Sequence, residues 1–198
     1  MKDINFPVDL EFKIGTFAND FEAKDSQGST LAYVYQKMFK FKEEILVYKD
    51  TSKSEVIFHI KADSWLDFSA AYSFFDAREN EFGKIVRKGW KSIWKSNYEI
   101  IDQYGKEQYK IGEESAWVKV MDSIFGGIPV LSIFTGYIFN PSYILTTFEG
   151  AEIARLSKIP SFWGRKFQIT KLSDIDNDDE TRIMLGFMMM VLLERERG

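Results

Sequence analysis

The chain has no cysteine, one histidine and only four prolines in 198 residues. Without cysteine it can form neither a disulfide framework nor a thiolate zinc site, and it has no cysteine to carry a palmitate. The single histidine, His59, excludes a site built from several histidines, and any Ser-His-acid triad would have to use it. There is also no Walker A loop, GxSxG elbow or HExxH helix. We therefore expect no enzyme and no cofactor, although sequence leaves open whether two of the many carboxylates meet in a catalytic pair.

The chain also has no excess of positive charge. It contains 26 Lys and Arg and 30 Asp and Glu, which gives a net charge of −4. This balance makes nucleic acid the least favoured partner. The N-terminal residues alternate apolar and charged side chains and contain no continuous apolar stretch, unlike a secretory signal, so we expect a cytoplasmic location. With 45% hydrophobic residues, residues 1–198 can bury one sizeable core, and we expect a single domain.

Short strands are predicted along most of the chain. Phe6, Val8, Leu10, Phe12 and Ile14 alternate with polar residues, as in a strand with one buried face. A weaker unit then recurs, in which alternating apolar residues run into a turn residue: FEAKDSQG, LVYKD, YSFFDAREN, YEIIDQYG and YILTTFEG. Because Asp bonds its own backbone and Gly or Asn tolerates positive φ, each unit predicts a β-hairpin, and its aspartate is read as structural.

Two segments depart from the strand pattern. Residues 114–125 place Trp117, Val120, Met121 and Ile124 at helical spacing, which predicts an amphipathic helix packed on the barrel wall. Residues 183–193 (IMLGFMMMVLL) have no polar side chain, so a helix there must be buried on all sides. Its length is about 16 Å, whereas a bilayer core needs about 20 residues. We therefore expect a helix through a soluble core, in which the methionines fill irregular space.

Many antiparallel strands followed by one apolar helix predict a mostly β (α+β) fold, a closed barrel around a buried C-terminal helix. The chain also resembles the LURP-one-related and phospholipid scramblase-like proteins of the Tubby C-terminal-like superfamily. The resemblance lies in FGKIVRKGWKSIWKSNYEIIDQYG (82–105), NPSYIL (140–145), ARLSKIPSFWGRKFQIT (154–170) and the apolar C-terminal run. It implies a barrel of about 12 strands around a C-terminal helix. It also implies lipid chemistry, because Tubby domains bind phosphoinositides and scramblases act on phospholipids.

An acidic run precedes the terminal helix, and Asp174, Asp176 and Asp178 match the first, third and fifth positions of an EF-hand loop. The match then fails, because Asp179 stands where glycine is required and Leu185 where a glutamate belongs. Scramblases carry an acidic calcium-responsive segment in the corresponding place. Acidic residues at a helix N-terminus also complement the helix dipole, so both calcium binding and capping are retained as hypotheses.

Two basic segments are the other candidate site. The first holds Lys84, Arg87, Lys88, Lys91 and Lys95, with Trp90 and Trp94 interleaved and no acid; the second holds Arg155, Lys158, Arg165 and Lys166 around Trp163. Cations and tryptophans together suit an anionic phospholipid headgroup, phosphoinositide-like in the family. We expect a peripheral membrane-binding domain. The alternatives are a solvated strand with core tryptophans, a nucleic-acid contact, a protein-interaction or structural domain, and scramblase-like lipid transport, which the short charged-ended helix disfavours.

Overall fold

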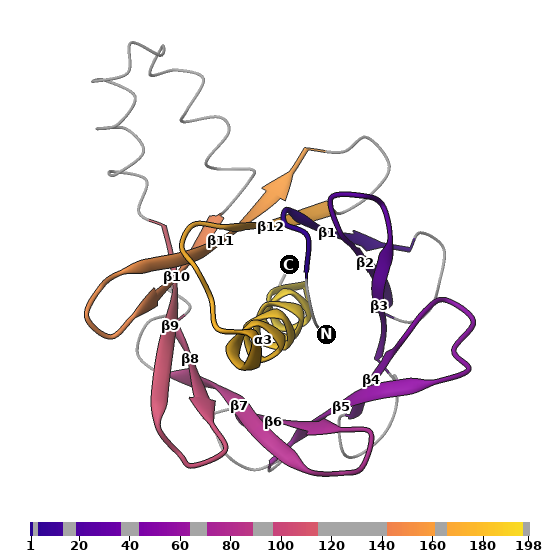
Figure 1. Ribbon diagram of the computed structural model, residues 1–198, viewed down its shortest axis with the longest axis horizontal. Coiled ribbons are helices and arrows are strands. Elements are labelled where there is room, and N and C mark those ends of the chain that lie inside the picture. Colours follow the sequence, from indigo (N-terminus) through magenta and orange to yellow (C-terminus); the bar gives the residue numbers. More distant parts are fainter. Residues whose placement is uncertain are drawn as a thin grey trace.

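The computed structural model describes residues 1, 4–13, 19–36, 44–63, 71–88, 97–114, 142–160 and 166–195. These residues form a closed antiparallel barrel around one helix (Figure 1). The strands are β1 (Val8–Phe12), β2 (Phe21–Lys24), β3 (Thr30–Gln36), β4 (Glu44–Tyr48), β5 (Val56–Ala62), β6 (Ala71–Asp76), β7 (Glu81–Lys88), β8 (Asn97–Asp102), β9 (Glu107–Glu113), β10 (Ser142–Thr147), β11 (Glu152–Ile159) and β12 (Lys166–Lys171). Each strand pairs with its neighbours in sequence, and β1 pairs with β12 to close the barrel. The predicted twelve-stranded barrel is confirmed.

Each of the five predicted repeat units forms a hairpin, joining β2 to β3, β4 to β5, β6 to β7, β8 to β9 and β10 to β11. In three of them one Asp Oδ1 accepts two backbone N–H groups of its own turn, as Asp76 does from Arg78 and Asn80. Asp25 and Asp102 make the equivalent pair of bonds. The structural interpretation of these turn aspartates is therefore confirmed.

The order of the strands gives the barrel two different ends. The five tight hairpin turns lie at one end, which we call the turn end, together with the segment that leads from β12 into the helix. The opposite end, which we call the loop end, is where β1, β3, β5, β7, β9 and β11 finish and the next strands begin. The connections at the loop end contain the internal residues that the structure does not describe.

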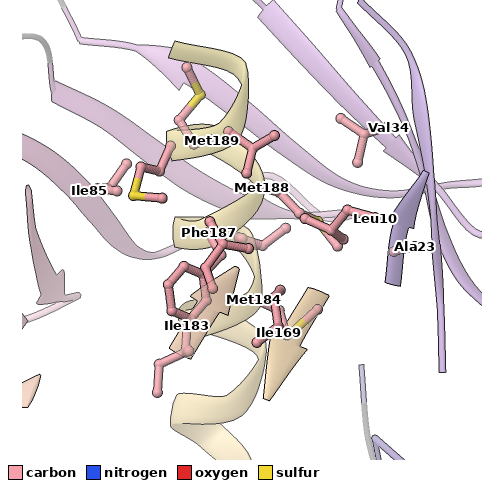
Figure 2. Packing of buried hydrophobic residues seen from close by; sticks show 14 of the residues in the cluster. Leu10, Ala23, Val34, Ile85, Ile169, Ile183, Met184, Phe187, Met188 and Met189 are labelled. Atoms are coloured by element: carbon pink, nitrogen blue, oxygen red, sulfur yellow. The ribbon is translucent and has the colours of Figure 1, made fainter. Parts of the chain in front are cut away.

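Helix α3 (Asn177–Arg195) runs through the barrel from the turn end toward the loop end (Figure 1). Its residues 183–192 are all buried, and Figure 2 shows Met184, Phe187 and Met188 lying among side chains of the surrounding strands. Inward positions such as Leu10 and Ile169 alternate with outward polar positions along the strands. The prediction of a buried helix that fills the barrel, with methionine as filler, is confirmed.

The predicted amphipathic helix at 114–125 lies outside the described residues except at its first position. Glu114 belongs to the sheet instead, because its backbone N–H donates to the carbonyl of Ser142 and so continues the pairing of β9 with β10. At this first position the prediction of a helix is wrong, and its other positions lie outside the described residues.

Candidate functional site

The turn end of the barrel holds the first turn of α3 through a buried arginine. Arg182 is only 5% exposed. Its Nε donates to the carbonyl oxygen of Phe82 at 3.0 Å, and its terminal nitrogens bond Gln103, Gln108 and Asp179. Every nitrogen of the guanidinium is thus bonded, which is what makes a buried charge tolerable. Arg182 was missed from the sequence, because it was counted among the charges that flank the apolar run.

Carboxylates of the acidic run also bind other parts of this end. Asp179 accepts a 2.6 Å hydrogen bond from the Tyr109 hydroxyl, and burial together with that bond raises the pKa of Tyr109. Glu180 lies 3.7 Å from the amine of Lys171. These contacts give the C-terminal part of the run a structural role at the start of α3.

The three predicted calcium ligands occupy different positions. Asp174 and Asp176 are exposed in the segment before α3, and Asp178 is the second residue of the helix. The backbone carbonyl of Asp176 accepts the N–H groups of Asp179 and Glu180 and so begins the helix. Within the described residues, no group of three or more His, Cys, Asp and Glu side chains is arranged to hold a metal ion.

Each predicted basic segment includes the end of a strand at the loop end of the barrel. The first covers the end of β7 and the connection to β8, and the second covers the end of β11, the connection to β12 and the first residue of β12. Two strands, β9 and β10, stand between them around the circle. Lys91, Lys95 and Arg165 lie outside the described residues, as does each tryptophan named with them.

Three of the predicted lipid-binding cations are already paired with carboxylates on the outer wall. The amine of Lys88 lies 2.8 Å from Glu99 and 3.3 Å from Glu107. These bonds raise the pKa of Lys88, the one to Glu99 most.

The other two paired cations belong to the second segment. The amine of Lys166 lies 2.8 Å from Asp9 and 3.1 Å from Glu11, and Arg155 lies 3.2 Å from Glu114. Lys88, Arg155 and Lys166 therefore form ion pairs within the barrel wall, and a ligand would have to displace their carboxylate partners.

Three other predicted cations differ from these. Lys84 and Arg87 have no ion-pair or hydrogen-bond partner in the part of the chain that the structure describes, whereas Lys158 has partners. Lys84 points outward from β7, and Arg87 and Lys158 lie on inward-facing positions near the loop end, as their register partners Tyr98 and Phe167 show.

His59 lies on the outer face of β5, where its side chain is 19% exposed. Its Nδ1 is 3.6 Å from Glu44 and its Nε2 is 3.6 Å from Glu79. Two flanking carboxylates and no neighbouring nucleophile in the described wall favour the structural interpretation of this histidine.

In the described part of the chain, no helix is both long enough and apolar enough to span a bilayer.

The fold defines a class of protein, a closed antiparallel barrel with a hydrophobic helix along its axis. Within that class, the family model described as LURP-one-related matches residues 30–174 of this chain. The chain belongs to the LURP-one-related family, and its kinship with Tubby and scramblase-like proteins is a relation at the superfamily level. The match spans β3 to β12 and stops before α3. No curated protein sequence matches the chain significantly.

Proposed function

We propose that this chain is a non-enzymatic binding domain that docks its loop end on anionic phospholipid at a membrane surface. Membership of the LURP-one-related family is consistent with a Tubby-like lipid-binding domain. The proposal makes the protein peripheral to the membrane and its ligand a phosphoinositide-like or other acidic headgroup.

One observation supports the proposal: both basic segments and all five tryptophans fall in parts of the sequence that join or include strand ends at the loop end. The tryptophans are residues 65, 90, 94, 117 and 163, and each falls in a connection that begins and ends on the loop-end rim. Tryptophan favours the interface between lipid and water, as membrane-docking surfaces require.

The opposite end of the barrel has the wrong charge for an anionic surface. The turn end carries carboxylates in its hairpins and before α3, namely Asp25, Asp50, Asp76, Asp102, Glu149, Glu152, Asp174 and Asp176. A negative leaflet attracts nearby Lys and Arg by about 1 kcal/mol each and repels carboxylates in the same way. The turn end also carries cations, among them Lys49, Lys53, Arg78 and Lys106, but its carboxylates outnumber these four, which supports docking by the loop end.

Co-sedimentation with vesicles tests the proposal. We expect binding to phosphatidylcholine vesicles that contain phosphatidylserine, weak binding to pure phosphatidylcholine, and loss of binding at high salt. The double variant Lys91→Glu, Lys95→Glu should bind more than tenfold more weakly, since each cation contributes about 1 kcal/mol. The matched control is Lys106→Glu, a charge reversal at an exposed turn-end residue, which should bind like the wild type. Equal binding to neutral and anionic vesicles, or none, would refute the proposal.

The competing proposal is a protein-interaction domain. Among the described residues, the large hydrophobic side chains that are exposed are Tyr104, at 85%, and Leu172, at 39%. These two residues offer little apolar area for a partner. A protein complex whose affinity is insensitive to salt, formed by a chain that ignores anionic vesicles, would favour this class instead.

A further inference from the structure

The inner wall of the barrel changes character close to the loop end. Deeper in the barrel many inward positions of β7 to β11 are apolar, as with Ile85, Ile100 and Leu145. At the last inward position before the loop end, five consecutive strands carry Arg87, Tyr98, Glu113, Tyr143 and Lys158, of which the two tyrosines belong to the hydrophobic core. On the other half of the barrel the corresponding positions include Phe12, Phe21 and Phe167, and also the buried Gln36. Arg87, Glu113 and Lys158 are therefore charged side chains at the edge of a mostly apolar interior.

Arg87 is the unusual member of this group. It is directly paired in register with Tyr98, which is 1% exposed and belongs to the core, so the two side chains share the inner face. Arg87 is itself half-buried, and it is without a hydrogen-bond or ion-pair partner in the described residues, while the other four all have partners. A guanidinium carries five N–H donors in a planar fork, and no Arg87 nitrogen is among the buried unbonded atoms of the described residues, so these donors are open to solvent or to a ligand.

We propose that Arg87 on the inner rim binds the phosphate of a phosphomonoester lipid headgroup, an inference that rests on the proposed function. Phosphate oxygens match the planar fork of arginine and accept two parallel hydrogen bonds from it, which a lysine cannot supply. Tyr98 places a hydroxyl-bearing ring beside Arg87.

On the outer wall, Lys84 is also without a partner among the described residues, but a lysine lacks the planar fork of arginine, and the other predicted cations there are paired. Lys88, Arg155 and Lys166 are bound by carboxylates of neighbouring strands. A headgroup would have to displace those partners before it could bind any of the three. Arg87 needs no such exchange with the described residues, and its place on the rim of the loop end is where a docked bilayer would present its phosphates.

A structural role for Arg87 has to be distinguished from binding. Helix α3 ends at this side of the barrel, and a cation near a helix C-terminus is stabilised by the partial negative charge of the last carbonyls. In that case removing the arginine would lower stability and leave lipid selectivity unchanged. If the arginine binds lipid, its removal would change selectivity and leave stability unchanged.

The test compares vesicles that contain phosphatidic acid, a phosphomonoester, with vesicles that contain phosphatidylserine, matched in surface potential. The variants are Arg87→Gln, Arg87→Lys and Lys106→Gln in the full chain. Lys106→Gln is the matched control, because Lys106 is an exposed cation at the turn end of the barrel. We expect the wild type and Lys106→Gln to prefer phosphatidic acid by about tenfold, and both Arg87 variants to lose that preference without a change in melting temperature.

The outcomes separate the two proposals. If anionic vesicles of both kinds bind equally well to the wild type and to Arg87→Gln, loop-end docking stands and the Arg87 site is refuted. If Arg87→Gln melts at a lower temperature and keeps the preference, the arginine is structural and the site is also refuted. If the wild type binds no anionic vesicle, the proposed function fails and the Arg87 proposal fails with it.

Discussion

Arg182 of the helix packs closely against Gly83 of the barrel wall. A Cβ atom added at Gly83 would lie 2.7 Å from both Cδ and Nε of Arg182, and 2.7 Å from the carbonyl oxygen of Ile101. Gly83 also has a φ of +151°, which side-chain-bearing residues rarely adopt. The glycine therefore makes room for the buried arginine that fixes the start of α3.

We expect Gly83→Ala to lower the free energy of unfolding by about 1–3 kcal/mol through overpacking, in addition to its backbone strain. The measurement is urea denaturation followed by circular dichroism. Gly105→Ala is the matched control, because Gly105 has a φ of +82° with no atom within 4 Å of an added Cβ. In that control the free energy of unfolding should fall only by the cost of the backbone strain, about 1–2 kcal/mol. Equal losses at the two positions would show that Arg182 adapts to the added methyl.

The hairpin is the element that this sequence specifies most fully. Asp25, Asp76 and Asp102 each sit four residues before the N–H that closes their turn, so the signal and the structure lie within the same few residues. Local hydrogen bonding of this kind can be read from sequence without knowing what else is near.

Acid should weaken these turns, and Asp76 provides the test. Its hydrogen bonds with Asn80 and Arg78 lower the pKa of the Asp76 carboxyl below its usual value. Because the folded pKa is depressed, the carboxylate stabilises the fold above the unfolded value of about 4 and loses this effect as the pH falls through the folded pKa. We expect Asp76→Asn, which keeps an acceptor oxygen, to reduce the slope of unfolding free energy against pH between about 4 and 2. An unchanged slope would show that Asp76 does not contribute to the acid sensitivity.

Ion pairs between elements could not be predicted in the same way. Lys88 was predicted to contact lipid, yet its amine lies between Glu99 and Glu107 because β7, β8 and β9 are adjacent in a particular register. Lys166 meets Asp9 only because β12 closes the barrel against β1. Composition identified the basic segments, whereas the partners of each cation depend on strand neighbours far away in sequence.

Across the whole molecule, the alternation of turns and loops polarises the barrel. An antiparallel barrel in which neighbours in sequence are neighbours in space sends every second connection to the same end. The short acidic turns gather at one end and the tryptophan-bearing connections at the other. Sequence predicted the barrel and its helix, but the shared end of the two basic segments became visible only once the strand order was known.

This polarity predicts which end of the protein meets lipid. Vesicles of anionic lipid mixed with phosphatidylcholine brominated on its acyl chains should quench the intrinsic tryptophan fluorescence, because all five tryptophans lie in loop-end connections. The chain has no cysteine, so Thr51→Cys introduces a unique site for a fluorescent label at an exposed position of the turn end. That label should remain unquenched by the same vesicles, and high salt should abolish the tryptophan quenching because electrostatic attraction brings the two surfaces together. Quenching of the label with unaffected tryptophans would place the turn end against the bilayer and refute the proposed orientation.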